Sequence, residues 1–148
     1  TALLKGGTIQ PVPSYEINDK IDKLDEELQF FMKNIDQYEI GEYIEQVAYF
    51  TYKFIVIHPF RDGNGRISRA IMNWLLSKKK IPPIYIDQKC RKEYYDALSK
   101  IDLEEDPVPF IMFIEKRIIH TMIELHRYLF VDEIDEEEIN EEAEVNGN

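Results

Sequence analysis

Residues 58–69 bring together most of the side chains in this chain that are suited to chemistry on a charged substrate. They read His-Pro-Phe-Arg-Asp-Gly-Asn-Gly-Arg-Ile-Ser-Arg. Gly63 and Gly65 have no β-carbon, so the backbone there can turn sharply and bring its amides close to a ligand. These amides stand at the start of a predicted helix, where free N–H groups and the helix dipole favour an anion. The segment therefore predicts a phosphate site.

Two arginines reinforce this prediction. Arg66 and Arg69 lie three residues apart in the first turn of the predicted helix, so they share neighbouring parts of one face. Each guanidinium can bind phosphate oxygens through two parallel hydrogen bonds. Two cations at this end of a helix oppose its dipole, and a polyanionic ligand would remove that penalty. A ligand with several phosphates is the expected occupant.

Asp62 and His58 supply the remaining chemistry. One carboxylate together with phosphate oxygens is the usual way to hold Mg²⁺, which makes Asp62 the candidate metal ligand. His58 is the candidate general base near the predicted pocket. Taken singly, a histidine at a helix end and an Asp-Gly-Asn-Gly turn are most often structural. Their combination with two arginines within twelve residues favours a functional site.

The surrounding sequence predicts an all-α bundle of about five to seven helices that would hold this segment between two of them. Apolar residues recur at the spacing of one helix face in five stretches, and no stretch shows sustained two-residue alternation. Ser14 is a candidate cap for the first helix. A small β-hairpin flap is expected at about residues 3–12, because Gly6-Gly7, Pro11 and Pro13 punctuate it. The predicted helices are 17–35, 42–57, 67–80, 88–100 and 107–129.

Charge divides the chain into two parts. Residues 1–130 carry the apolar pattern of a domain, whereas residues 131–148 contain nine acids and no base, against a net charge of −11 for the chain. Such a segment predicts a disordered, solvated tail, with a tether for a basic partner as the alternative. No basic stripe favours nucleic acid, and no apolar run is long enough to span a membrane. A single cysteine, Cys90, predicts a reducing cytoplasm, and a first residue other than Met favours a chain that was processed or cut from a longer one.

The twelve residues resemble the signature of the Fic domain family at every defined position: His-Pro-Phe-x-acid-Gly-Asn-Gly-Arg-x-x-Arg. The resemblance extends less sharply from the flap to the fifth predicted helix, and includes the segment Tyr94-Tyr95-x-Ala97-Leu98. Members of this family typically transfer AMP from ATP, with release of pyrophosphate, to a Ser, Thr or Tyr hydroxyl of a target protein. The resemblance therefore implies a Mg²⁺-dependent protein adenylyltransferase, with ATP and an unidentified protein as its partners.

The resemblance also implies a role for each matching residue. His58 would deprotonate the target hydroxyl, and Asp62 would hold Mg²⁺ between the α- and β-phosphates. The family's pattern assigns the anion hole to Gly63, Asn64 and Gly65, the β-phosphate to Arg66 and the γ-phosphate to Arg69. It assigns anchoring of the loop in the core to Phe60 and contact with the adenine to Tyr94 or Tyr95. Target docking by strand addition would fall to Gly7, Thr8 and Ile9.

One feature of many family members is missing from the pattern. They carry an inhibitory helix in which a Ser or Thr is followed four residues later by Glu, and no Ser or Thr of this chain has that spacing. Inhibition is then expected from a separate protein or an upstream segment. Two alternatives to AMP transfer remain: a family variant that moves another phosphate-bearing group, and a catalytically silent nucleotide-binding module. Gly65 stands where the kinase-like branch of the family carries Lys, which argues against phosphorylation.

Overall fold

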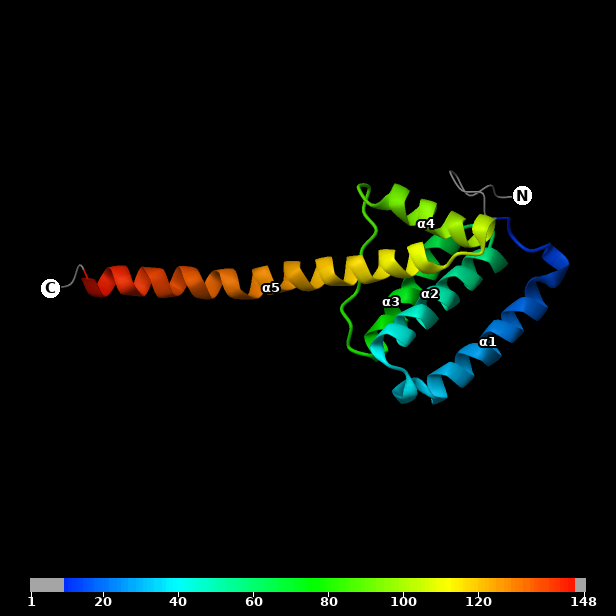
Figure 1. Ribbon diagram of the computed structural model, residues 1–148, viewed down its shortest axis with the longest axis horizontal. Helices are drawn as coiled ribbons and strands as arrows, with labels where there is room; N and C mark the ends of the chain where they lie inside the picture. Colours follow the sequence, from blue (N-terminus) through cyan, green and yellow to red (C-terminus); the bar gives the residue numbers. More distant parts are fainter. Residues whose placement is uncertain (1–9, 146–148) are drawn as a thin grey trace.

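The computed structural model describes the backbone of residues 10–145 and the side chains of residues 10–130. Every regular element in this part of the chain is helical, which confirms the all-α prediction (Figure 1). Two 3₁₀ turns accompany the five α-helices. The elements are η1 (Ser14–Glu16), α1 (Ile17–Lys33), η2 (Ile35–Gln37), α2 (Ile40–Ile57), α3 (Asn64–Lys78), α4 (Arg91–Glu104) and α5 (Val108–Val145).

Helix α2 is the centre of the bundle. It packs against α1, α3 and α5, and half of its residues are buried. Its N-terminus is fixed by a capping box in which Glu39 and Glu42 satisfy each other's backbone amides. The Tyr43 hydroxyl donates a 2.6 Å hydrogen bond to the carbonyl of Leu75 and so ties α2 to α3. These contacts hold rigid the two helices that flank the predicted site.

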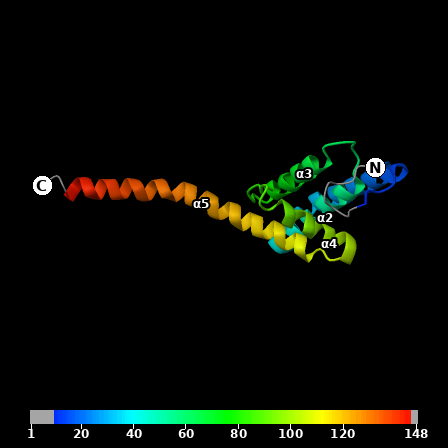
Figure 2. The ribbon, with the colours of Figure 1, turned by 90° about the horizontal axis from the view of Figure 1, so that it is seen from above.

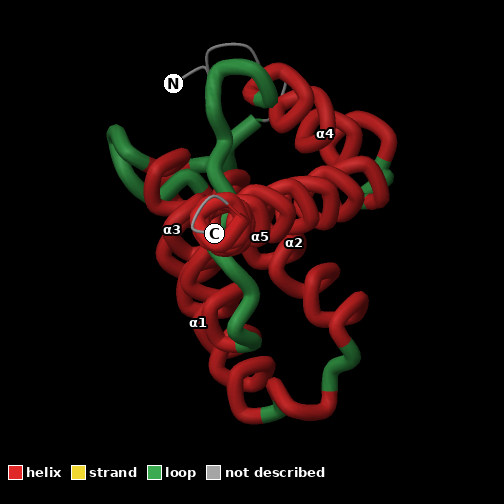
Figure 3. Tube along the Cα trace, turned by 90° about the vertical axis from the view of Figure 1, so that its left-hand side faces the viewer, coloured by secondary structure: helices red, strands yellow, loops and turns green. Residues whose placement is uncertain are grey.

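The remaining helices close the core around α2. Aromatic side chains from α1, α4 and α5 contribute Phe31, Tyr94, Phe110 and Phe113, each at most 2% exposed. Helix α4 packs on α5, which crosses the bundle and then continues beyond it (Figures 1 and 2). An end-on view places α1 to α4 around the axis of α5 (Figure 3). The loop between α2 and α3 lies at one end of the bundle, outside this core.

Near its two ends, the chain differs from the sequence predictions or is not described. Ser14 does not cap α1: it begins η1, and the residue before α1 is Glu16, without a side-chain cap bond. The expected hairpin at about residues 3–12 lies almost wholly outside the described residues, and its described part, residues 10–12, has no strand. Helix α5 continues through Val145, so the structure gives helical backbone to residues 131–145, where the sequence predicted a disordered tail. Glutamate favours helix, and no Gly or Pro interrupts residues 110–146.

Candidate active site

The loop that carries the candidate base begins where α2 ends. His58 terminates α2 in the left-handed conformation, with φ of 51° and its N–H bonded to the carbonyl of Phe54 at 3.1 Å. Such a φ is uncommon for a residue with a β-carbon and is often found where the surrounding structure holds a functional residue in place. The His58 side chain is half-buried, and its Nδ1 is buried without a hydrogen-bond partner in the described structure. The ring is therefore held by packing on one side.

Asn64 fixes the loop in an unexpected way. Its side chain is 3% exposed; its Oδ1 accepts from the N–H of Phe60 at 3.0 Å, and its Nδ2 donates to the carbonyl of Phe60 at 2.6 Å. Both hydrogen-bonding ends of the amide are thus used to close a five-residue loop. In this structure the Asn64 side chain faces the loop backbone, so its expected part in an anion hole would fall to its backbone N–H and stays a prediction.

Phe60 does not anchor the loop in the core, which corrects an expectation from the sequence. Its side chain is 50% exposed, and its ring lies 6.4 Å from that of buried Phe54, centroid to centroid. The buried hydrogen bonds of Asn64 anchor the loop instead. Ser68, which is fully buried, adds a bond from its Oγ to the carbonyl of Gly65 at 3.1 Å.

The start of α3 has the features of an anion site. Gly63 precedes the helix with φ of 85°, a conformation suited to glycine, and no side chain in the described structure caps the helix amides. The N–H of Gly63 donates to the Oδ1 of Asp62 at 2.6 Å. The first amides of α3, from Asn64 onward, therefore remain available, as the sequence predicted.

The two arginines lie over the glycines of the preceding turn. A β-carbon on Gly63 would meet the guanidinium of Arg66 at 3.4 Å, and one on Gly65 would meet that of Arg69 at the same distance. The Arg66 guanidinium also forms a 3.1 Å ion pair with Asp62, whose side chain is 92% exposed. Exposed pairs of this kind are weak and are readily exchanged for a ligand. Asp62, Arg66 and Arg69 are thus brought to one helix end, as predicted.

Tyr94 lies in the core and not beside a ligand. It is 1% exposed and packs against Phe110 and Phe113, with ring centroids at 5.8 and 5.6 Å. The expectation that Tyr94 flanks the adenine is therefore wrong. Burial raises the pKa of its hydroxyl to about 12, although the nearby charge of Arg69 acts in the opposite direction. Tyr95 contacts Tyr94 edge-on at 5.2 Å and is only half-buried, so it remains the adenine candidate of the pair.

A hollow of about 580 Å³ lies between the loop and the segment that precedes η1. Its walls are residues 11–14, Ile17 and residues 58–61. The N–H of Val12 donates to the carbonyl of Val56 at 3.0 Å and holds this segment beside the end of α2. Residues 11 and 12 belong to the expected flap, whereas Pro13 and Ser14 were not expected at the site. Their only signal was the Pro11-x-Pro13 pattern, which favours an extended backbone. Gly7, Thr8 and Ile9, the expected docking residues, lie outside the described residues.

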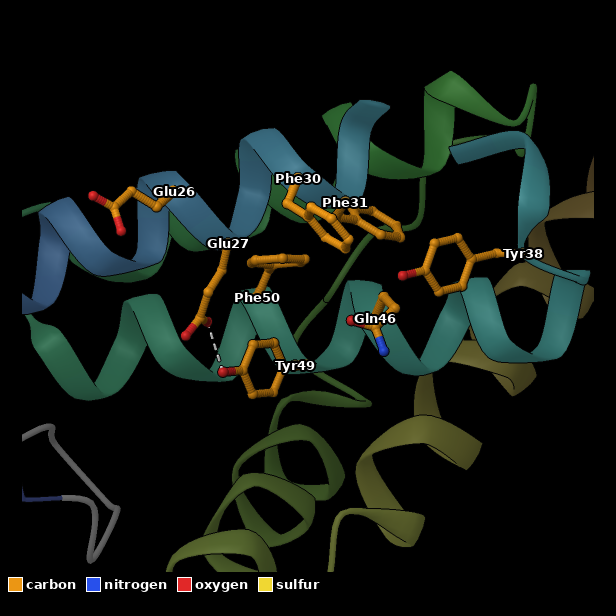
Figure 4. Close-up of a pocket in the computed structure, with 8 residues that line it drawn as sticks. All are labelled: Glu26, Glu27, Phe30, Phe31, Tyr38, Gln46, Tyr49 and Phe50. Atoms are coloured by element: carbon orange, nitrogen blue, oxygen red, sulfur yellow. Dashed lines mark hydrogen bonds between the residues drawn. The ribbon is translucent and has the colours of Figure 1, made fainter. Parts of the chain in front are cut away.

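A second hollow, of about 560 Å³, lies between α1 and α2, and none of its lining residues belongs to the loop (Figure 4). Phenylalanine and tyrosine side chains line it together with Glu26 and Glu27, and Glu27 accepts a 2.8 Å hydrogen bond from the hydroxyl of Tyr49. The carboxylates of Glu26 and Glu27 make this hollow unsuited to a polyphosphate.

Among the described residues, no group of three or more His, Cys, Asp or Glu side chains is placed to hold a metal ion. No described helix is both long and apolar enough to cross a membrane.

Comparisons with known proteins agree with this geometry. Residues 5–76 match the Fic/DOC family. The protein adenylyltransferase fic-1 of Caenorhabditis briggsae is 32% identical over 83% of this chain and 22% of its own length. The protein adenylyltransferase Fic of Drosophila persimilis is 46% identical over 48% of this chain and 14% of its own. The chain thus spans less than a quarter of the length of these relatives.

Solved structures share the fold. A Fic-domain signaling protein from Bacteroides thetaiotaomicron has a TM-score of 0.68 at 24% identity, over 82% of this chain and 50% of its own. Fic-1 from C. elegans has a TM-score of 0.67 at 25% identity, over 84% of this chain and 35% of its own. The signature at 58–69, the helical bundle that presents it and these similarities lead to one conclusion: the chain belongs to the Fic/DOC family.

Proposed function

We propose that this chain transfers AMP from ATP to a Ser, Thr or Tyr hydroxyl of a target protein and releases pyrophosphate. The observation that carries the proposal is the N-terminal end of α3, where uncapped helix amides, two arginines and the exposed carboxylate of Asp62 come together directly after the loop that begins at His58. The naming of relatives as protein adenylyltransferases supports the reaction type.

His58 is proposed as the general base. Because its Nδ1 is buried without a partner, Nε2 is the nitrogen left to take a proton from a substrate hydroxyl. The oxygen then attacks the α-phosphorus, the bond to the β-phosphate oxygen breaks, and pyrophosphate leaves with that electron pair. The left-handed backbone at His58 and the Asn64 bonds to Phe60 fix the ring relative to α3, so most of the rate enhancement is expected from positioning.

The triphosphate is proposed to bind across the start of α3. The first helix amides and the helix dipole would stabilise negative charge near the α-phosphate. Arg66 is proposed for the β-phosphate and Arg69 for the γ-phosphate. Binding would release Arg66 from its exposed pair with Asp62, since a phosphate offers the guanidinium a stronger, bidentate partner.

Asp62 fits the role of a Mg²⁺ ligand. Its two oxygens offer more acceptor sites than the single bonds to Gly63 and Arg66 use, and its side chain is 92% exposed. Since Asp62 belongs to no group of three or more His, Cys, Asp or Glu side chains in the described residues, the substrate phosphates would complete the coordination. Bound there, Mg²⁺ would neutralise charge on the phosphates during transfer. The residues present therefore fit the metal that the family resemblance implies.

Mass spectrometry of a lysate incubated with the protein, ATP and Mg²⁺ tests the proposal. The expected result is a 5′-AMP adduct on Ser, Thr or Tyr of at least one protein, absent with the His58→Ala variant. His58→Ala is a suitable control because the ring makes no described hydrogen bond or ion pair to the proposed phosphate residues. A transferred phosphate or other nucleotide fragment in place of AMP would contradict the proposal, as would AMP adducts that persist with His58→Ala.

A further inference from the structure

Helix α5 has two apolar faces, of which the bundle uses one. Phe110, Phe113, Ile114 and Ile118 are buried in the core of the chain. On the opposite side, at spacings of 7, 4 and 7 residues, stand four apolar side chains that share a narrow stripe at 100° per residue. They are Met112, Ile119, Ile123 and Phe130, with exposures of 60%, 58%, 46% and 45%.

This outer stripe is not covered by any described part of the chain. Helix α5 crosses the bundle and then leaves it, and from two directions its second half stands clear of the other helices (Figures 1 and 2). Met122 and Leu129 widen the exposed surface on one side. A row of exposed apolar side chains along one face of a helix that projects from its domain is suited to a protein interface.

Charge is distributed unequally along the same helix. A groove of about 710 Å³ between α4 and the start of α5 is lined by four lysines and only two acids, with Met112 and Phe113 among its apolar walls. The lysines are Lys89, Lys92, Lys100 and Lys116. Three of them already pair within the chain, Lys92 with Asp96, Lys100 with Glu104 and Lys116 with Glu93, so four lysines stand against three acids there. The groove is therefore net positive, whereas the far end of α5, residues 132–144, contains nine acids and no base.

We propose that two copies of this chain associate through an antiparallel pair of α5 helices. The stripe of Met112, Ile119, Ile123 and Phe130 would form the seam. With the crossing midway between Ile119 and Ile123, Met112 would face the partner's Phe130, and the acidic end of each α5 would lie along the lysine-lined groove at the start of its partner's α5. A parallel pair would instead bring two acidic ends together and would be opposed by repulsion, so charge selects the antiparallel arrangement.

Sedimentation equilibrium of the full chain tests the association. Wild type is expected to be dimeric, and the double variant Ile119→Asp/Ile123→Asp is expected to raise the dissociation constant by about 30-fold or more, since each change places a charge in an apolar seam. Ile40→Asp is the matched control, because Ile40 is an isoleucine of similar exposure, 56%, at the start of α2. Circular dichroism confirms that both variants fold. A monomeric wild type, or equal weakening by the control, would overturn the proposal.

Zero-length cross-linking tests the direction of the pair. A carbodiimide joins a lysine to a carboxylate that it contacts, and a mixture of ¹⁴N- and ¹⁵N-labelled chains marks links between copies. Mixed-isotope links between the groove lysines and residues 132–144 are expected, and truncation after Val131 should weaken association. Links between the acidic end and only its own chain, or a dimer whose dissociation constant is unchanged by the truncation, would overturn the antiparallel arrangement. Neither experiment depends on AMP transfer, so its failure leaves the proposed function intact.

Discussion

Replacement of Asn64 by alanine should destabilise the protein by about 2–4 kcal/mol. The change removes two buried hydrogen bonds, of 3.0 and 2.6 Å, from the Asn64 amide to the backbone of Phe60. A buried backbone group left without its hydrogen-bond partner costs about 1–3 kcal/mol, so the two groups of Phe60 together cost about 2–6 kcal/mol. The lower part of that range applies here, because half-exposed Phe60 lets water reach the freed groups.

Urea denaturation and ATP titration together separate the possible roles of Asn64. Asn73→Ala is the matched control, because the Asn73 amide bonds the N–H and carbonyl of Ile84 at 2.9 and 3.0 Å in the same way, away from the His58 loop. Both variants should lose similar stability, but only Asn64→Ala should lose ATP affinity and transfer at a temperature where both are folded. Asn34→Ala, which removes an exposed bond to Phe30, should cost less than about 1 kcal/mol.

An Asn64→Ala variant that unfolds at the same urea concentration as wild type and yet binds ATP much more weakly would contradict the role of Asn64 as a loop clamp. That result would mean that the side chain contacts the phosphates directly, as the sequence predicted, and that its bonds to Phe60 contribute little.

Four further changes test other parts of the site. His58→Ala should abolish transfer while the ATP dissociation constant changes by less than about tenfold, as measured by calorimetry, because the ring acts on the target hydroxyl; equal loss of both would make His58 structural. Asp62→Ala should weaken ATP binding chiefly when Mg²⁺ is present, and an identical defect in EDTA would exclude the metal role. Tyr94→Phe should leave ATP affinity within about twofold and stability unchanged or raised, because the buried hydroxyl has no hydrogen-bond partner; a tenfold loss of affinity would place the hydroxyl in the site. Deletion of residues 132–148 should change the rate of transfer little, whereas a silent intact chain and an active truncated one would identify the tail as an inhibitor.

The helices were predictable because each buries one face against a single core. In α2, for example, Val47, Phe54 and Ile55 recur at helical spacing, and all three are buried. The loop from Pro59 to Gly63 was predictable for a different reason: proline cannot continue a helix, and glycine readily adopts the positive φ that a tight turn needs. The placing of Arg66 and Arg69 on neighbouring parts of one helix face followed from helical spacing alone.

What the sequence left open depends on tertiary contacts. An asparagine beside two glycines suits an anion hole and a loop clamp equally well, and only the position of the Phe60 backbone decides between them. Tyr94 and Tyr95 are adjacent and of one type, so the pattern did not decide which faces the core. The acidic residues after Val131 predicted disorder from charge, but glutamate also has high helix propensity, and α5 reaches them without a Pro or Gly to stop it.

The central claim is that the N-terminal end of α3 positions ATP so that a target hydroxyl, deprotonated by His58, attacks the α-phosphorus. The most direct measurement compares ATP labelled on the α-phosphate with ATP labelled on the γ-phosphate, each incubated with the chain, Mg²⁺ and lysate proteins. The account predicts that protein takes up the α-label and not the γ-label, and that His58→Ala removes the signal. Uptake of the γ-label, or of the α-label by wild type and His58→Ala alike, would contradict it.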